Sequence, residues 1–381
     1  MKRGWLRDNQ MLCRFLFSVF FALTAVAAGR SALAQTGAGA MLVSPSLLEH
    51  EGLQVGWQNN LPVKQAESAE RMFVFGKYLY VLTDQNYLFC IDREKGKMRF
   101  CLQLATAGLK VYEPQYYDGK LLFTVGNRFL ILDPAAGIVT DSKQFDAIGR
   151  VAVCPAVRNC RHIFVAGLDK RLHAMVADEY WQEFTITADN DSLINSLVVD
   201  DEFVVFSTEV GNVVKTSSQK AKRLWQRDIP GRISAPIARD GRWLYVGSIN
   251  MKLYKLDINT GQSGWGAAFQ AGAELTNSAI VGKKAIYQYA GENGLYAIDK
   301  VSGKELWQVR GAVGLLAEKG STAYVFARPG MLVVMDNSTG KKLYSVNFAG
   351  VSTYVVNTTD SIIYVSDNRG RVMSIEAKVQ K

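Results

Sequence analysis

The sequence predicts an all-β protein: an eight-bladed β-propeller of four-stranded antiparallel blades, closed by an N-terminal strand that completes the last blade. Three observations support this fold class. A motif recurs about every 40 residues, each recurrence contains four short strand-like segments, and the repeats contain no amphipathic helical segment. Repeats of this length that each form one small antiparallel sheet are typical of propellers, whereas solenoids are built from paired helices.

The recurring motif is clearest in GLYAIDKVSGKELWQV, Gly294–Val309, where a strand ends in an Asp, a turn follows and a second strand carries a Trp. LFCIDREKGKMRF, LYKLDINTGQSGW and LVVMDNSTGKKLY are further copies, and degenerate copies fill the gaps. The Asp, or the residue in its place, recurs at intervals of 37 to 43 residues, at positions 92, 133, 176, 217, 257, 299, 336 and 376. Eight such positions predict eight blades.

The copy from Ser234 to Phe269 shows the content of one unit. We expect its four strands at Ala235–Ala238, Trp243–Gly247, Lys252–Asp257 and Gln262–Phe269, because turn residues separate these apolar segments. Elsewhere, strand segments such as LYVL, residues 79–82, are apolar at consecutive positions rather than alternating. Both faces of each sheet are therefore expected to be covered by a neighbouring sheet, as in a propeller.

The two ends of the chain predict how the last blade is completed. In good copies an aromatic residue lies eight positions after the Asp, but the last repeat position, Glu376, is followed by only five residues. Trp57 lies 43 residues before Phe100, one repeat ahead of the first full unit. We therefore expect residues near 54–63 to supply the missing strand of the last blade and to hide its free edges.

The repeated residues have local structural roles. The Asp carboxylate can accept from backbone N–H groups two or three residues on, the Gly supplies a positive φ, and the aromatic side chain can wedge between blades while an indole N–H finds a carbonyl. A role repeated in most blades favours structure over catalysis. The residues assigned to it are Asp92, Gly96, Phe100, Asp133, Gly137, Trp225, Asp257, Gly261, Trp265, Asp299, Gly303, Trp307, Asp336, Gly340 and Tyr344, with Trp57 at the closure.

The N-terminal segment predicts export. Basic residues precede an apolar run, Phe15–Gly29, and an Ala-x-Ala pattern at Ala32–Ala34. We expect residues 1–34 to be a signal peptide, 35–52 a linker and 53–378 the propeller. The run is too short to favour a membrane anchor. Residues 1–34 carry five basic residues and one acidic residue, so the formal net charge falls from +9 for the whole chain to +5 without them. That charge is scattered, which disfavours nucleic-acid binding.

Four cysteines remain after the signal, in a compartment that permits disulfides. Three pairings exist, and the local one, Cys90–Cys101 with Cys154–Cys160, is favoured because each pair would lie on two consecutive strands. The alternative is four small apolar core residues. His162 and His173 lie on neighbouring predicted strands and would share one face, but no third ligand accompanies them, so no metal site is expected.

The stretch AIDKVSGKELW closely resembles the repeat of the PQQ-like (pyrroloquinoline-quinone-type) β-propellers, A-x-D-x-x-T/S-G-K-x-x-W, and the resemblance extends over residues 53–376. A single exported eight-bladed domain is closest in form to the BamB-type assembly factors of that family. The resemblance implies a non-enzymatic scaffold that helps to insert β-barrel proteins into the bacterial outer membrane. The chain departs from those lipoproteins in two respects: Ala32–Gln35 contains no Cys for acylation, and the chain lacks the arginine-and-aspartate loop segments that the resemblance implies for contact with the barrel-forming partner. No contact residue is therefore assigned.

The same family contains quinoprotein dehydrogenases, which supply the alternative function of a ligand-binding or quinone-dependent redox propeller. The resemblance implies for such enzymes a disulfide between adjacent cysteines, and this chain has no Cys-Cys dipeptide. It also lacks G-x-S-x-G, H-E-x-x-H, G-x-G-x-x-G and phosphate-loop sequences. We therefore expect no enzymatic activity and no cofactor.

Charged residues gather in the third to fifth repeats, where the motif is most degenerate. Acidic runs at 178–179, 189–191 and 200–202 are followed by Lys220, Lys222, Arg223, Arg227, Arg232, Arg239 and Arg242. They form either a solvated surface or a polarised docking surface for a protein partner. The expectation from the sequence is a monomeric scaffold, periplasmic or associated with the outer membrane, that binds a protein of the cell envelope, including the barrel assembly machinery.

Overall fold

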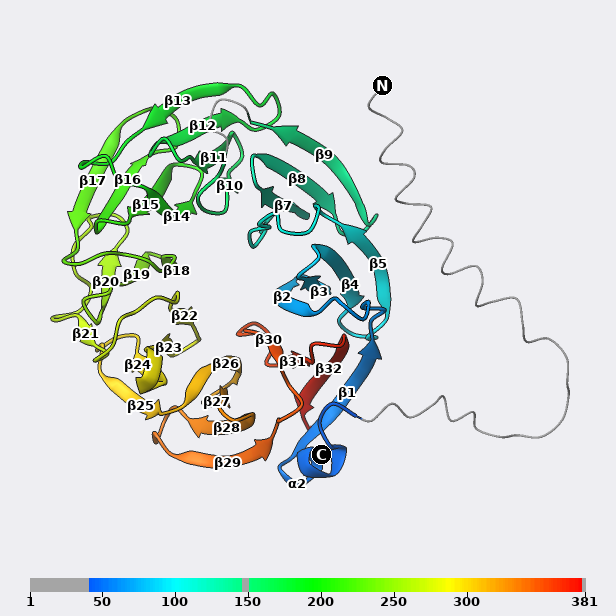
Figure 1. Ribbon diagram of the computed structural model, residues 1–381. Helices are drawn as coiled ribbons and strands as arrows, with labels where there is room; N and C mark the ends of the chain where they lie inside the picture. The colour runs from blue at the N-terminus through cyan, green and yellow to red at the C-terminus, as the bar shows by residue number, and fades with distance from the viewer. Residues whose placement is uncertain (1–40, 146–150, 379–381) are drawn as a thin grey trace, which may run out of the picture. The chain divides into compact units, whose positions relative to one another are not determined.

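The structure is a computed structural model that describes residues 41–145 and 151–378. The expected signal peptide lies outside the described residues. From Leu42 onward the chain forms one compact unit of eight four-stranded antiparallel sheets, which succeed one another around a ring (Figure 1). The eight-bladed propeller expected from the repeat is thus confirmed. None of the helices within the described ranges has the length and apolarity required to cross a membrane.

Seven blades are each built from four consecutive strands. Blade 1 contains β2 (Ala69–Phe75), β3 (Tyr78–Thr83), β4 (Tyr87–Asp92) and β5 (Met98–Gln103); blade 2 contains β6 (Gln115–Tyr117), β7 (Lys120–Val125), β8 (Arg128–Asp133) and β9 (Ile138–Gln144). Blade 3 contains β10 (Val157–Arg158), β11 (His162–Ala166), β12 (Leu172–Val176) and β13 (Gln182–Ile186); blade 4 contains β14 (Ile194–Val199), β15 (Phe203–Thr208), β16 (Asn212–Ser217) and β17 (Arg223–Asp228).

The following blades repeat this order. Blade 5 contains β18 (Ala238–Asp240), β19 (Trp243–Gly247), β20 (Lys252–Asp257) and β21 (Phe269–Gln270); blade 6 contains β22 (Ile280–Val281), β23 (Ala285–Tyr289), the 3₁₀ turn η1 (Gly291–Asn293), β24 (Leu295–Asp299) and β25 (Glu305–Val309). Blade 7 contains β26 (Ala312–Lys319), β27 (Thr322–Ala327), β28 (Met331–Asp336) and β29 (Lys342–Asn347).

Blade 8 combines the two ends of the described chain. β30 (Thr353–Val355), β31 (Ile363–Ser366) and β32 (Arg371–Ala377) are followed in the sheet by β1 (Leu53–Asn60), which pairs antiparallel with β32 from Leu53 opposite Ala377 to Asn60 opposite Arg371. The pairing contains an irregularity between Val55 and Trp57. The first strand of the described residues therefore lies beside β32 as the fourth strand of the sheet formed by the last three (Figure 1).

The core is divided into eight hydrophobic clusters among the described residues, and each lies between two consecutive blades. Each blade contributes one face to each of two clusters, which explains why the middle strands are apolar at consecutive positions. β11, for example, is buried at all five of its residues. Lateral packing of blade on blade, rather than a single central core, holds the ring together.

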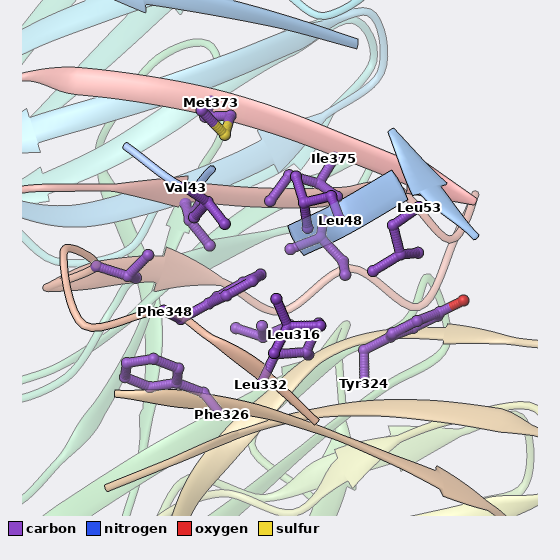
Figure 2. Close-up of a cluster of buried hydrophobic side chains, with 14 of the residues drawn as sticks. Val43, Leu48, Leu53, Leu316, Tyr324, Phe326, Leu332, Phe348, Met373 and Ile375 are labelled. Atoms are coloured by element: carbon purple, nitrogen blue, oxygen red, sulfur yellow. The ribbon is translucent and has the colours of Figure 1, made fainter. Parts of the chain in front are cut away.

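A short segment before β1 adds to the cluster between blades 7 and 8. The helix α2 (Pro45–His50) begins with a proline in its first turn, where the missing N–H is not needed. Leu48 of α2 and Val43 before it are buried beside Phe348 and Ile375 (Figure 2). Residues 42–52, which the sequence pattern placed in a linker, therefore pack on the propeller.

Two strands of blade 5 differ from their expected extents. β19 and β20 have the predicted bounds, but β18 covers Ala238–Asp240 instead of Ala235–Ala238, and β21 is limited to Phe269–Gln270 instead of Gln262–Phe269. Small residues occupy the expected start of β21. Ser263 forms one isolated bridge to Leu256, and at Gly264 a β-carbon would lie 2.4 Å from the ring of Trp243. The chain therefore leaves the sheet before it returns at β21.

Candidate interaction surfaces

The Asp of each good repeat organises the turn between the third and fourth strands. Asp299 Oδ1 accepts hydrogen bonds from the backbone N–H groups of Val301 at 3.2 Å and Ser302 at 2.7 Å. Asp92, Asp133 and Asp257 accept from the equivalent two N–H groups, and Asp336 accepts from that of Ser338. Hydrogen bonds from Ser302 hold the pKa of Asp299 below its usual range, and those from Ser338 lower the pKa of Asp336 to about 2.

The aromatic wedge joins one blade to the next. Trp265 of blade 5 donates its indole N–H to the carbonyl of Lys300 in blade 6 at 3.1 Å, and Trp225 donates in the same way to Ile258 at 3.0 Å. Trp57 donates to Arg93 at 2.7 Å, which links blade 8 to blade 1. Trp307 is the exception, since its partner is the side chain of Asn337.

The repeated glycine has a second role that the sequence did not reveal. Gly303 has a φ of +72°, and a β-carbon at this position would lie 2.7 Å from Trp265. Phe100 covers Gly137, Trp225 covers Gly261 and Trp57 covers Gly96 in the same manner. The glycine of one blade is therefore the seat of the aromatic side chain of the preceding blade, which spacing within a single repeat cannot show.

The favoured disulfides are wrong. Cys90 lies opposite Phe100 in the β4–β5 register, so the next residue along β5, Cys101, faces the other side of the sheet. The two cysteines accordingly belong to different inter-blade clusters. Cys154 and Cys160 lie beyond opposite ends of β10 and do not bridge. Burial raises the pKa of the Cys90 and Cys154 thiols to about 12, so both act as small core residues.

The two histidines of blade 3 do not share a face. His173 lies opposite Val165, three positions along β11 from His162, so the two rings point to opposite sides of the sheet. His162 contacts Glu183, whereas His173 lies 2.9 Å from Asp169 and 2.6 Å from Gln182. Across residues 41–145 and 151–378 no group of three or more His, Cys, Asp or Glu side chains is arranged to hold a metal ion.

Many of the clustered charges neutralise one another. Arg239 of blade 5 lies 2.6 Å from Asp200 of blade 4, and Arg223 lies 2.8 Å from Asp189. The Arg239 guanidinium lowers the pKa of Asp200. Because these pairs join basic residues to the acidic runs, charge alone does not define a docking surface.

Exposed apolar residues define a candidate docking surface more clearly than the charges do. The hairpin between the second and third strands carries an exposed apolar residue at its tip in three consecutive blades: Leu168 in blade 3, Val210 in blade 4 and Met251 in blade 5. Their exposed fractions are 51%, 50% and 42%. We call these three residues the tip patch. All second-to-third hairpins of a propeller lie on one face, here named the hairpin face.

The other hairpins of this face are polar or lack an exposed apolar tip. Blade 1 has Asp84 and Gln85 there, blade 2 has Asn127, and blade 6 has Glu292. The tip patch is also bordered by ion pairs, Lys170 with Asp191 at 3.1 Å and Glu209 with Arg232 at 3.9 Å. An apolar centre within a polar rim is the usual anatomy of a protein–protein interface.

Met251 of the tip patch is held in an unfavourable backbone conformation. Its φ is +67°, in the left-handed region that glycine adopts without cost. A methionine there costs on the order of 1 kcal/mol and places an apolar side chain in water. The equivalent hairpin positions Asn86, Lys170 and Gly211 also have a positive φ, so this conformation belongs to the turn, and Met251 is the apolar residue among them.

Comparison with known proteins supports the architecture. The sequence profile of the family described as "Outer membrane protein assembly factor BamB" matches residues 48–267 and 210–323. No curated protein matches the chain. Two similar solved structures are a computationally designed protein, Ika8, and BamB from Moraxella catarrhalis.

Ika8 has a TM-score of 0.65 at 14% identity, with 83% of this chain and 98% of that chain covered. The Moraxella protein has a TM-score of 0.64 at 12% identity, with 86% and 99% covered. At such identities the structural likeness shows the fold alone. The profile match spans well over half of the chain, and on that basis the chain belongs to the BamB family of PQQ-repeat propellers.

Proposed function

We propose that this protein is a non-enzymatic scaffold of the cell envelope that binds a protein partner and serves the assembly of outer-membrane proteins. The tip patch carries the proposal, because three consecutive blades present exposed apolar residues on one face. Membership of the BamB family supports the same direction. We further propose export by the signal peptide at residues 1–34 and a location in the periplasm or at the outer membrane.

The tip patch is suited to a protein partner rather than to a small substrate. Leu168, Val210 and Met251 project from separate hairpins, so only a ligand that spans three blades contacts all of them. Buried apolar side chains within a polar rim supply most of the affinity of such interfaces. A barrel-assembly component that presents a complementary apolar surface is the expected partner.

The direct test is affinity capture from envelope extract under conditions in which a known complex survives. The wild-type protein should recover a barrel-assembly component. The triple variant Leu168→Ser, Val210→Ser and Met251→Ser should lose it by at least about tenfold, since each apolar contact contributes on the order of 1 kcal/mol. A control triple variant, Leu224→Ser, Val301→Ser and Leu343→Ser, removes exposed apolar residues outside the patch and should retain the partner. Equal loss in both variants would exclude the tip patch as the docking site.

The absence of enzymatic function is tested separately. Incubation of purified protein with pyrroloquinoline quinone and Ca²⁺, followed by gel filtration, should leave no quinone absorbance on the protein. Dye-linked oxidation of alcohols and sugars should remain at the level of a blank. Quinone retention together with oxidation would replace the scaffold function by a redox function.

A further inference from the structure

The boundary between blades 2 and 3 differs from every other boundary at the wedge position. The wedge position is the residue of the fourth strand that lies opposite the third-strand residue two positions before the repeat Asp, or before the residue in its place. Strand register gives this position in seven blades, and in blade 5 it follows from the spacing after the Asp. In seven of the eight blades this fourth-strand residue is aromatic: Phe100, Phe184, Trp225, Trp265, Trp307, Tyr344 and Trp57. In blade 2 it is Asp141, opposite Ile131.

Blade 3 compensates in part for the missing wedge. Its third-to-fourth turn has Tyr180 where blades 1, 2, 5, 6 and 7 have the repeated glycine, and Tyr180 adopts the same left-handed conformation with a φ of +61°. The hydroxyl of Tyr180 donates a hydrogen bond to Asp141. At several other boundaries the earlier blade supplies the aromatic ring and the later blade the small turn residue. At this boundary blade 2 supplies Asp141 and blade 3 supplies the ring of Tyr180.

A pocket of about 250 Å³ lies at the same boundary, and Ile131, the residue opposite Asp141, is part of its lining. Lys120, Leu122 and Ile131 of blade 2 form one side, and Arg158 and Asp178 of blade 3 form the other. Because Asp178 belongs to the turn between the third and fourth strands, the cavity opens on the face opposite to the hairpin face. Asp178 is 88% exposed at its mouth.

Blade 5 shows what equivalent positions hold elsewhere. There the residues that correspond to Lys120, Leu122 and Ile131 are Trp243, Tyr245 and Lys255, because Leu122 pairs with Ile131 as Tyr245 pairs with Lys255. Tyr245 lies 5.8 Å from the wedge Trp265. The Lys255 ammonium lies 4.2 Å from the ring of Trp243 and 5.7 Å from that of Trp265. In blade 5, therefore, the space that corresponds to the pocket is occupied by the wedge Trp265, which aromatic and cationic side chains surround.

We propose that the cavity between blades 2 and 3 binds an aromatic side chain, a Trp or a Tyr, that a partner protein supplies. Leu122 and Ile131 provide the apolar floor. Arg158, which already lies 5.0 Å from the ring of Tyr117, provides a cation for an aromatic face, as Lys255 does in blade 5. The Asp178 carboxylate accepts from an indole N–H or a phenol O–H, just as wedge indoles donate to the following blade.

The charges of the lining favour an aromatic ligand over a simple anion. Lys120 and Arg158 are balanced by Asp118 and Asp178, so the formal charge of the lining is zero. The Arg158 guanidinium lies 3.7 Å from Asp178. A carboxylate ligand would gain two cations but would also approach two carboxylates, whereas a neutral ring with one polar group meets no like charge.

This inference rests on the proposed scaffold function, since it gives that scaffold a second docking point on the opposite face. Its test uses the purified protein and N-acetyl-tryptophanamide, a neutral mimic of a partner tryptophan, in a ligand-observed NMR titration. Binding is expected with a dissociation constant on the order of 1 mM, as for a small fragment in a shaped site. N-acetyl-leucinamide and acetate should not bind below about 10 mM.

Two variants locate the binding. Leu122→Tyr introduces the residue that blade 5 has at this position; it should fill the cavity, leave the melting temperature unchanged or higher, and weaken binding at least tenfold. Arg158→Gln should weaken binding several-fold without filling the cavity. Leu343→Tyr makes the same chemical change at a half-exposed site on blade 7 and should bind the probe like the wild type.

The outcomes separate this inference from the proposed function. Absence of tryptophanamide binding, equal binding by the Leu122→Tyr protein, or stronger binding of acetate would each overturn the aromatic pocket. None of these results concerns partner capture through the tip patch. Conversely, tryptophanamide binding that is lost in Leu122→Tyr would support the pocket even if capture through the tip patch failed.

Discussion

At the scale of single residues, the fold depends on a glycine that carries the aromatic wedge of the neighbouring blade. The glycine must both adopt a positive φ and leave room for a ring, and these two demands can be separated by mutation. Gly303 is subject to both demands. Gly241 is subject only to the first, since its φ is +56° and a β-carbon added there would meet no atom within 4 Å.

Gly303→Ala should therefore destabilise the protein more than Gly241→Ala. The conformational cost is about 1 kcal/mol for both, and displacement of Trp265 adds about 2 kcal/mol for Gly303. Equilibrium unfolding in urea measures both free energies. Equal losses of unfolding free energy in the two variants would show that Trp265 moves without cost and that its contact with Gly303 does not contribute to stability.

The turn aspartates make stability dependent on acid pH. Hydrogen bonds lower the pKa of Asp336 to about 2, below the value of about 3.9 expected in the unfolded chain. A carboxyl group with a depressed folded-state pKa contributes stability above its unfolded pKa and loses that contribution as the pH falls through its folded pKa. Asp336→Asn should therefore reduce the fall in unfolding free energy between pH 5 and pH 2. An unchanged slope in the variant would contradict the assigned hydrogen bonds.

At the scale of elements, β1 connects the two ends of the propeller. Its Trp57 donates to Arg93 in blade 1 and packs 6.0 Å from Tyr364 in blade 8. Trp57→Ala should cost about 2 kcal/mol and lower the amide protection of β31 and β32 by more than tenfold, because the strand that covers β32 is loosened. Hydrogen exchange measures the effect strand by strand.

Trp181→Ala is the matched control, since the Trp181 side chain is 49% exposed and does not occupy a wedge position. Its substitution should leave the protection of blade 8 unchanged. Similar exchange rates in the Trp57 and Trp181 variants would mean that β1 does not stabilise the last blade.

The sequence predicted the bounds of the two middle strands of blade 5 better than the bounds of its outer strand. β19 and β20 were predicted residue by residue, because apolar runs bounded by turn residues define them. β21 was predicted too long, since a Trp among glycines and serine packs inward without a continuous strand. The face on which Cys90 and Cys101 lie depends on cross-strand register, which repeat spacing leaves undetermined.

At the scale of the whole molecule, contacts between residues of different repeats could not be predicted from the sequence. The contact between Asp141 and Tyr180 involves two residues that are 39 positions apart and belong to different repeats. Each looks like a degenerate copy when read within its own repeat. Likewise, the tip patch becomes visible only when Leu168, Val210 and Met251 are placed on one face of the ring.

The two proposed docking surfaces lie on opposite faces of the molecule. The tip patch lies on the hairpin face of blades 3 to 5, and the cavity opens on the other face between blades 2 and 3. A rigid ring that presents distinct sites on its two faces is suited to holding partners in a fixed arrangement. The repeats supply the rigidity, while both proposed sites are formed by residues that depart from the repeat.

If the tip patch serves the assembly of outer-membrane proteins, their abundance should depend on it in living cells, which is measured in cells of the source organism that lack this gene. Quantitative mass spectrometry of isolated envelopes should show reduced outer-membrane proteins in those cells and full recovery with the wild-type gene. The Leu168→Ser, Val210→Ser, Met251→Ser variant should fail to restore them, although it is exported and folded like the Leu224→Ser, Val301→Ser, Leu343→Ser control, which should restore them. Full recovery with the tip-patch variant would show that the tip patch does not serve this assembly.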